Sequence, residues 1–121
     1  SPSCKYEGEV MFLEACNSAY RKSAIEAIGG FDESYHGVGD WSEPDCSYRI
    51  RQSGYKLLFV QGAKLYHEVS QSGAYAKRLS DNTRYQNYRL FAKRWIRPHW
   101  KHGVYLKFLE GYFLAKKWRV I

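Results

Sequence analysis

Two carboxylates, Glu43 and Asp45, stand on either side of Pro44 at the start of a short predicted helix. Proline is favoured in the first turn of a helix, because its missing N–H has no partner to lose there. Carboxylates placed where a loop meets a helix can be held at a cleft and used for chemistry. This stretch therefore connects local structure to a possible reaction.

Each carboxylate also has a structural interpretation. An acid in the first turn of a helix interacts favourably with the helix dipole, which by itself explains Glu43. Asp45 lies four residues before Arg49, which is the spacing of an ion pair on one helical face. The residues of this helix alone leave both interpretations open.

An apolar run and a capping signal predict the elements that precede this helix. Residues 10–15, VMFLEA, are bounded by charge and are typical of a buried strand. Ser23 and Glu26 have the spacing of a capping box, so we expect a brief helix to open at Ser23. Gly29 supplies the left-handed residue that ends it.

A glycine- and aspartate-rich segment, residues 29–41, predicts a loop that packs Phe31 inward. A loop of this length inside a compact domain is more often functional than idle. We expect Ser42 to cap the helix that follows the loop and Gly54 to end that helix.

Two strands and then helices are predicted for the rest of the chain. Residues 55–60 and 63–67 have strand patterns, and residues 81–96 have a helical pattern, with a second helix after His102. The whole order indicates a mixed α/β fold, with short strands, flanking helices and a C-terminal helical tail.

Charge divides the chain into two parts. Its 121 residues have the length of one domain, and 45% hydrophobic residues are enough to form a core. Residues 1–75 carry 7 Lys and Arg against 10 Asp and Glu, whereas residues 76–121 carry 12 against 2. The acidic part holds the candidate carboxylates, and the basic part suits a surface that meets phosphates or anionic lipid.

Cysteine usage and hydropathy predict the cellular setting. Cys4, Cys16 and Cys46 are odd in number and lack the spacing of a zinc site or a redox pair. No run approaches the roughly 18 to 20 apolar residues that span a bilayer. We expect a reduced, cytoplasmic protein, with peripheral attachment to the inner face of the cell membrane as the alternative.

Four motifs in order resemble the C-terminal half of a family 2 glycosyltransferase with the GT-A fold. They are NSAYRKSAI at residues 17–25, GGFDE at 29–33, SEPDCSYRIRQSGY at 42–55 and LYHEVS at 65–70. A fainter similarity continues into RYQNYR at residues 84–89. Several motifs in the correct order are far more specific than any one of them alone.

The resemblance implies an inverting transfer of sugar from a nucleotide-sugar donor to a saccharide or lipid-linked acceptor. In such enzymes a carboxylate at the start of this helix removes the proton of the acceptor hydroxyl, which attacks the anomeric carbon. The family pattern is Glu-Asp-x-Asp-Leu, and counting back from Arg49 puts Glu43 at the base position and Asp45 at the second acidic position. Glutamate in place of aspartate lengthens the reach of the base by one methylene.

The resemblance also implies which residues contact the substrates. Asn17 and Arg49 fall within the matching motifs, and Asp40 and Trp41 precede the base position, where the family has an acceptor-binding wall. The alternative for Asp40 and Trp41 is a loop anchor that packs over the helix, since tryptophan is highly buried on average.

A metal and the donor nucleotide are expected to involve residues outside this chain. His67 follows a predicted strand, where related transferases have a histidine near the metal or the diphosphate. Histidine can bind Mn²⁺ or Mg²⁺ when carboxylates complete the shell, and otherwise it is a packed or solvated side chain. The chain has no Asp-x-Asp. The resemblance therefore implies a missing N-terminal nucleotide-binding half, without which this part is inactive.

An aromatic stripe in the basic tail has several interpretations. Its members recur at helical spacing: Tyr105, Phe108, Leu109, Tyr112 and Phe113. Such a stripe can pack on its own protein or lie on an anionic membrane surface. The interleaved Lys, Arg and aromatic residues also suit a non-catalytic module that binds single-stranded nucleic acid. That alternative leaves the four motifs unexplained, so we do not expect nucleic acid as the partner.

Overall fold

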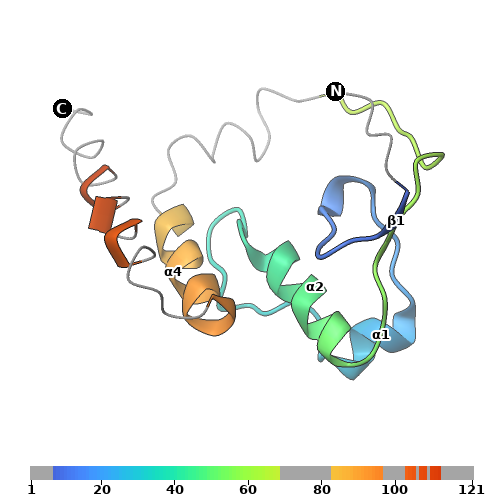
Figure 1. Ribbon diagram of the computed structural model, residues 1–121, viewed down its shortest axis with the longest axis horizontal. Coiled ribbons are helices and arrows are strands. Elements are labelled where there is room, and N and C mark those ends of the chain that lie inside the picture. Colours follow the sequence, from blue (N-terminus) through green and yellow to red (C-terminus); the bar gives the residue numbers. More distant parts are fainter. Residues whose placement is uncertain (1–6, 69–82, 97–102, 106, 109, 113–121) are drawn as a thin grey trace.

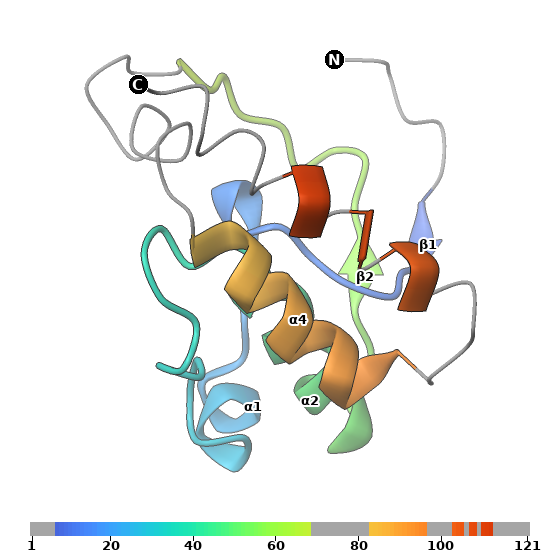
Figure 2. The same ribbon diagram turned by 90° about the vertical axis from the view of Figure 1, so that its left-hand side faces the viewer.

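A computed structural model describes residues 7–68, 83–96, 103–105, 107–108 and 110–112. Its elements follow the chain in a mixed order of helix and strand (Figure 1), namely β1 (Gly8–Glu9), η1 (Ala15–Asn17), α1 (Lys22–Ala27), α2 (Ser42–Gln52), β2 (Leu58–Phe59) and α4 (Thr83–Trp95). Figure 1 places α2 in the middle, with α4 on one side and α1 and the small sheet on the other, and Figure 2 shows α4 lying in front of α2. The structure is thus a mixed α/β arrangement, as the sequence predicts.

Helix α1 ends as expected but begins differently. Gly29 and Gly30 have φ values of 72° and 83°, and their N–H groups donate to the Glu26 and Ile25 carbonyls at 3.1 and 3.0 Å. These two bonds form a Schellman end, which confirms Gly29 as the left-handed stop. The prediction of a capping box at Ser23 and Glu26 is wrong. Arg21 is the N-cap residue and makes no side-chain cap, and Ser23 lies inside the helix.

Helix α2 is also predicted correctly in its extent and incorrectly in its cap. Trp41, not Ser42, occupies the N-cap position, and Ser42 is the first helical residue. At the other end Gly54 has a φ of 86° and donates to the Arg51 carbonyl at 3.0 Å, which confirms it as the stop. Pro44 lies in the first turn, where it displaces no helical hydrogen bond.

The sheet is smaller than the sequence predicts. β1 pairs with β2 antiparallel, with Gly8 opposite Phe59 and Glu9 opposite Leu58. Of the strand predicted at residues 10–15, only the Val10 N–H continues this pairing, to the Leu57 carbonyl at 2.9 Å. The prediction of a strand there is wrong, because the backbone beyond Val10 leaves the sheet.

The other predicted strands are also corrected. Within residues 55–60 only β2 is extended and paired. Residues 63–67 are not a strand in the structure, and their side chains are exposed. The Lys64 N–H donates to the Gly62 carbonyl at 3.0 Å, a local turn bond that replaces pairing with a neighbouring strand.

The long loop between α1 and α2 is held by its backbone rather than by Phe31. Phe31 is 44% exposed and meets Tyr20 edge-on at 6.4 Å between ring centroids, so the prediction that it packs inward is wrong. Instead, the side chain of Asn87 on α4 accepts from the His36 N–H at 3.0 Å and donates to the His36 carbonyl at 2.9 Å. This reciprocal pair fixes the loop against α4.

Two groups of buried side chains surround α2. On one face Cys46, Ile50 and Leu57 form a core against partly buried side chains of α1 and the segment after β1. On the other face α4 buries Tyr88, Phe91 and Ala92. Burial of this kind is the main favourable term in folding, and it ties α4 to the rest of the described structure.

The described part of the tail is helical, as predicted. Residues 103–105, 107–108 and 110–112 have helical backbone. Tyr105, Phe108 and Tyr112 are exposed, while Leu109 and Phe113 lie outside the described residues. The Tyr105 ring meets that of Tyr88 at 6.2 Å between centroids. Among the described helices none has the length and apolarity needed to cross a membrane.

Acid is expected to lower the free energy of unfolding by protonating Asp32 in the loop between α1 and α2. Hydrogen bonds from the Ser34 side chain and backbone N–H, and then from Arg94, lower the pKa of Asp32 from 3.8 to about 2. The folded state therefore holds its proton less tightly than the unfolded state, so stability is present above pH 3.8 and is lost as the pH falls toward 2. The free energy of unfolding, measured against pH, should fall less steeply in this range for Asp32→Asn. Equal slopes would contradict this assignment.

Candidate active site

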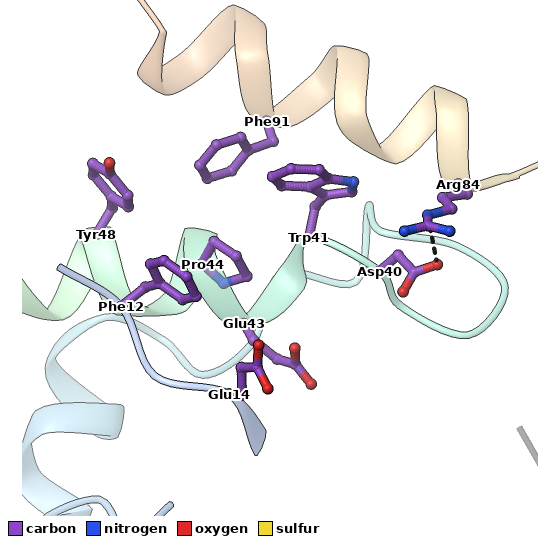
Figure 3. Close-up of a pocket in the computed structure, with 9 residues that line it drawn as sticks. All are labelled: Phe12, Glu14, Asp40, Trp41, Glu43, Pro44, Tyr48, Arg84 and Phe91. Carbon is purple, nitrogen blue, oxygen red and sulfur yellow. Dashed lines mark ion pairs between the residues drawn. The ribbon is translucent and has the colours of Figure 1, made fainter. Parts of the chain in front are cut away.

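The first turn of α2 opens onto a surface cavity with a volume of about 370 Å³. One wall comes from the segment after β1, one from the start of α2 and one from α4 (Figure 3). Apart from one proline, the lining side chains are aromatic or charged: Phe12, Glu14, Asp40, Trp41, Glu43, Pro44, Tyr48, Arg84 and Phe91. Three residues predicted for the site, Glu43, Asp40 and Trp41, thus meet at one cavity.

Trp41 holds an unusual backbone conformation at this cavity. Its φ of 75° makes it the only residue other than glycine with positive φ in the described part of the chain. A bulky side chain rarely adopts this conformation, and such strain persists only when surrounding contacts compensate for it. The indole packs on Tyr88 and Phe91 of α4, with ring centroids 4.8 and 5.2 Å apart. Trp41 therefore anchors the loop on α4 and lines the cavity, while its role as an acceptor-binding wall stays a prediction.

Glu43 reaches the cavity from the first turn of α2, where its negative charge also interacts favourably with the helix dipole. Glu14 reaches the same cavity from the segment after β1 (Figure 3). That segment is fixed by the Leu13 N–H, which donates to the buried Ser47 hydroxyl oxygen at 3.0 Å. Two carboxylates from distant parts of the sequence therefore face one cavity.

Asp40 and Arg84 close the cavity at the end where the loop meets α4. The Arg84 Nε lies 3.8 Å from the Asp40 Oδ2 (Figure 3). The Asp40 side chain is only 12% exposed, whereas that of Arg84 is 55% exposed. Asp40 thus has an ion-pair partner at the cavity, whereas neither Glu14 nor Glu43 pairs with a cation of the described residues.

Asp45 does not line the cavity and is completely buried. Its Oδ1 accepts from the Trp95 Nε1 at 2.7 Å and the Tyr35 hydroxyl at 3.1 Å, and its Oδ2 accepts from the Arg49 Nε at 2.8 Å. Arg94 adds a longer contact of 3.3 Å. Burial, and then the Asp45 carboxylate, raise the pKa of Tyr35, so its hydroxyl stays protonated and donates. Asp45 therefore joins α2, α4 and the loop.

Arg49 also connects parts of the fold, because it binds Asp45 and the end of α1. Beyond Asp45, its Nη1 donates to the Ile28 and Gly30 carbonyls at 2.9 and 2.8 Å. These carbonyls follow α1, so one guanidinium fixes the end of α1 to α2. Arg49 does not line the cavity, and the structure places it in the framework beneath the site.

No family model, curated protein or solved structure matches this chain. The resemblance to family 2 glycosyltransferases therefore stays a prediction that rests on the motifs of the sequence.

Asn17 and His67 lie apart from the cavity at Glu43. The Asn17 side chain donates to the Ala63 carbonyl at 2.8 Å, and it lines an adjoining hollow near β2 that shares Phe12 and Glu14 with the cavity. His67 lies in exposed coil. Across the described residues, no group of three or more His, Cys, Asp or Glu side chains could hold a metal ion. These residues do not form a metal site on their own, and His67 as a ligand completed from elsewhere stays a prediction.

Sequence reasoning missed six residues of the cavity. Phe12, Pro44, Tyr48 and Phe91 add apolar wall, Arg84 pairs with Asp40, and Glu14 supplies a second acid with no ion-pair partner among the described residues. The sequence carried one signal for Glu14, since it is the single charge inside the apolar run at residues 10–15. Nothing in the local pattern indicated that this run would cross the start of α2, because a contact over 34 residues places it there.

Proposed function

We propose that this chain is the acceptor-side part of an inverting glycosyltransferase. The donor is a nucleotide-sugar, and the acceptor is a saccharide or a lipid-linked saccharide. One observation carries the proposal: Glu43, the residue that the motifs put at the base position, lines a cavity walled by aromatic side chains. The volume of this cavity, about 370 Å³, is within the range of small-molecule sites, about 300–1,000 Å³.

Glu43 acts on the acceptor hydroxyl. Its carboxylate accepts the hydroxyl proton while the acceptor oxygen forms a bond to the anomeric carbon of the donor sugar. The bond from that carbon to the nucleoside diphosphate breaks, and the diphosphate leaves with the electron pair. A single displacement of this kind inverts the configuration at the anomeric carbon. Glu43 has no ion-pair partner among the described residues, so its charge is available to the bound acceptor.

The aromatic walls suit the apolar faces of a sugar ring. Phe12, Trp41, Tyr48 and Phe91 all line the cavity, and Pro44 adds a further apolar surface. Aromatic side chains bury a large apolar area at little cost in conformational freedom. Asp45 and Arg49 are positioning residues in this proposal, because they hold α2, and with it Glu43, against α1 and α4.

The donor nucleotide and the divalent Mn²⁺ or Mg²⁺ are proposed to bind mainly to residues outside this chain. When bound, the metal would supply positive charge to the leaving diphosphate. The described residues contribute to acceptor binding and proton removal instead. The exposed aromatic residues of the basic tail would suit a protein that works at the inner face of a membrane on a lipid-linked acceptor.

Acceptor-dependent turnover tests the proposal. The intact protein that contains this chain is incubated with a panel of nucleotide-sugars, a divalent metal and mixtures of saccharide acceptors. Release of nucleoside diphosphate is measured with and without acceptor. We expect release that depends on both substrates, because the acceptor supplies the attacking oxygen. Absence of release across the panel, or release that does not respond to acceptor, would argue against the proposal.

A further inference from the structure

The cavity at Glu43 has an unequal charge balance. Among the described residues, three carboxylates line it, those of Glu14, Asp40 and Glu43, together with one guanidinium, that of Arg84. Arg84 is already paired with Asp40. Two negative charges, from Glu14 and Glu43, are therefore left to face whatever the cavity binds.

The two acids differ in the way they are held. Glu43 belongs to the first turn of α2, where the helix dipole offsets part of its charge. Glu14 is the N-cap residue of the three-residue helix η1, makes no side-chain cap there, and is fixed through the backbone of Leu13. Its side chain is exposed, and it shows no ion pair with any described residue.

The aromatic walls and the two carboxylates that pair with no described cation together discriminate among ligands by their charge. A phosphate or carboxylate in the cavity would meet two like charges, which disfavours anionic ligands. A neutral saccharide can donate hydroxyl hydrogen bonds to both acids. A saccharide with a protonated amine gains a charge-assisted hydrogen bond, which is roughly twice as strong as a neutral one. The aromatic rings favour a cation as well, since their faces carry partial negative charge.

We propose that this cavity selects an acceptor saccharide that carries a primary ammonium group, and that Glu14 binds this group. The inference rests on the proposed function and gives the class of its acceptor. Glu14 is then a specificity-determining residue, and Glu43 remains free to take the proton of the reacting hydroxyl. Both acids reach the cavity from separate segments (Figure 3), so they can contact two different substituents of one sugar ring.

Matched sugars test the inference on the intact protein. The dissociation constants of methyl glucosaminide, its N-acetylated form and methyl glucoside are measured by calorimetry, with ethanolamine as an amine without a sugar ring. We expect the glucosaminide to bind about tenfold more tightly than the two neutral sugars, a difference that shrinks as salt is raised. Ethanolamine should bind more weakly than the glucosaminide, because it cannot use the aromatic walls.

A variant pair assigns the preference to Glu14. In Glu14→Gln the ratio of neutral to amine dissociation constants should fall toward one, because the amide carries no charge and only Glu43 and the aromatic rings still favour the cation. Glu33→Gln makes the same chemical change at an exposed residue that does not line the cavity, and it should keep the ratio. Equal binding of amine and neutral sugars, or a ratio that survives Glu14→Gln, would overturn the inference and leave the proposed function standing. Failure of every sugar to bind would count against both.

Discussion

Replacing Glu43 with glutamine is expected to lower kcat for sugar transfer by about 10²–10⁴-fold, the usual contribution of a positioned base. The amide keeps the size and the first-turn position of the glutamate but cannot accept the acceptor proton. Binding of the nucleotide should survive, because the proposed function places the donor mainly on residues outside this chain. Glu43→Asp keeps the carboxylate and shortens its reach, so its loss of kcat should be smaller than that of Glu43→Gln.

Initial rates of the intact protein at saturating donor and acceptor measure this effect. Glu33→Gln serves as the matched control, because it removes an exposed carboxylate elsewhere in the loop. Turnover of Glu43→Gln at the wild-type rate would show that Glu43 is not the base, even if the cavity still binds the acceptor.

Asp45→Asn should lower the free energy of unfolding by about 3–5 kcal/mol, the usual cost of removing one member of a buried ion pair. The wild-type carboxylate is fully buried and accepts hydrogen bonds from Trp95, Tyr35 and Arg49. An asparagine amide has only one acceptor oxygen, and its NH₂ group would face a donor. The charge of Arg49 would then lack its closest carboxylate.

Chemical denaturation of the wild type and the variants checks this prediction. Tyr35→Phe removes one of the donors to Asp45 and should cost about 1 kcal/mol. Glu26→Gln breaks an exposed pair with Lys22 at 3.6 Å and should change stability by less than about 1 kcal/mol. If Asp45→Asn were no more costly than Glu26→Gln, the central place of Asp45 in the packing of α4 on α2 would be wrong.

Helix ends show where local sequence is sufficient. Gly29 and Gly54 end α1 and α2 as predicted, because a left-handed residue at a helix end is a local requirement that glycine meets. The beginnings were not predictable in this way. Trp41 takes the N-cap position of α2 because its ring packs on Tyr88 and Phe91 of α4, some fifty residues along the chain.

Strands depended still more on distant partners. The run at residues 10–15 has a strand pattern, but after Val10 its backbone bonds to the Ser47 side chain of α2 instead of another strand. Residues 63–67 have a similar pattern and remain exposed coil. Strand propensity expresses the fit to a pleated, half-buried surface, and in the described structure neither segment finds one.

Closeness in sequence made part of the candidate site predictable. Glu43, Asp40 and Trp41 are close in sequence, so local structure brings them to one cavity. Asp45 and Arg49 stand at ion-pair spacing, and their structural interpretation agrees with the burial that is observed. Glu14 could be placed only by the fold, since its position depends on a long-range hydrogen bond at Leu13.

The anomeric configuration of the product reports directly on the proposed role of Glu43. We expect one displacement, in which Glu43 activates the acceptor hydroxyl and no bond forms between the sugar and the protein. The product made by the intact protein from an α-linked nucleotide-sugar should therefore be the β-glycoside, as proton NMR of the purified product can determine. An α-glycoside would show that Glu43 does not act as the base of a single displacement, because retention requires a second displacement or a different course of attack.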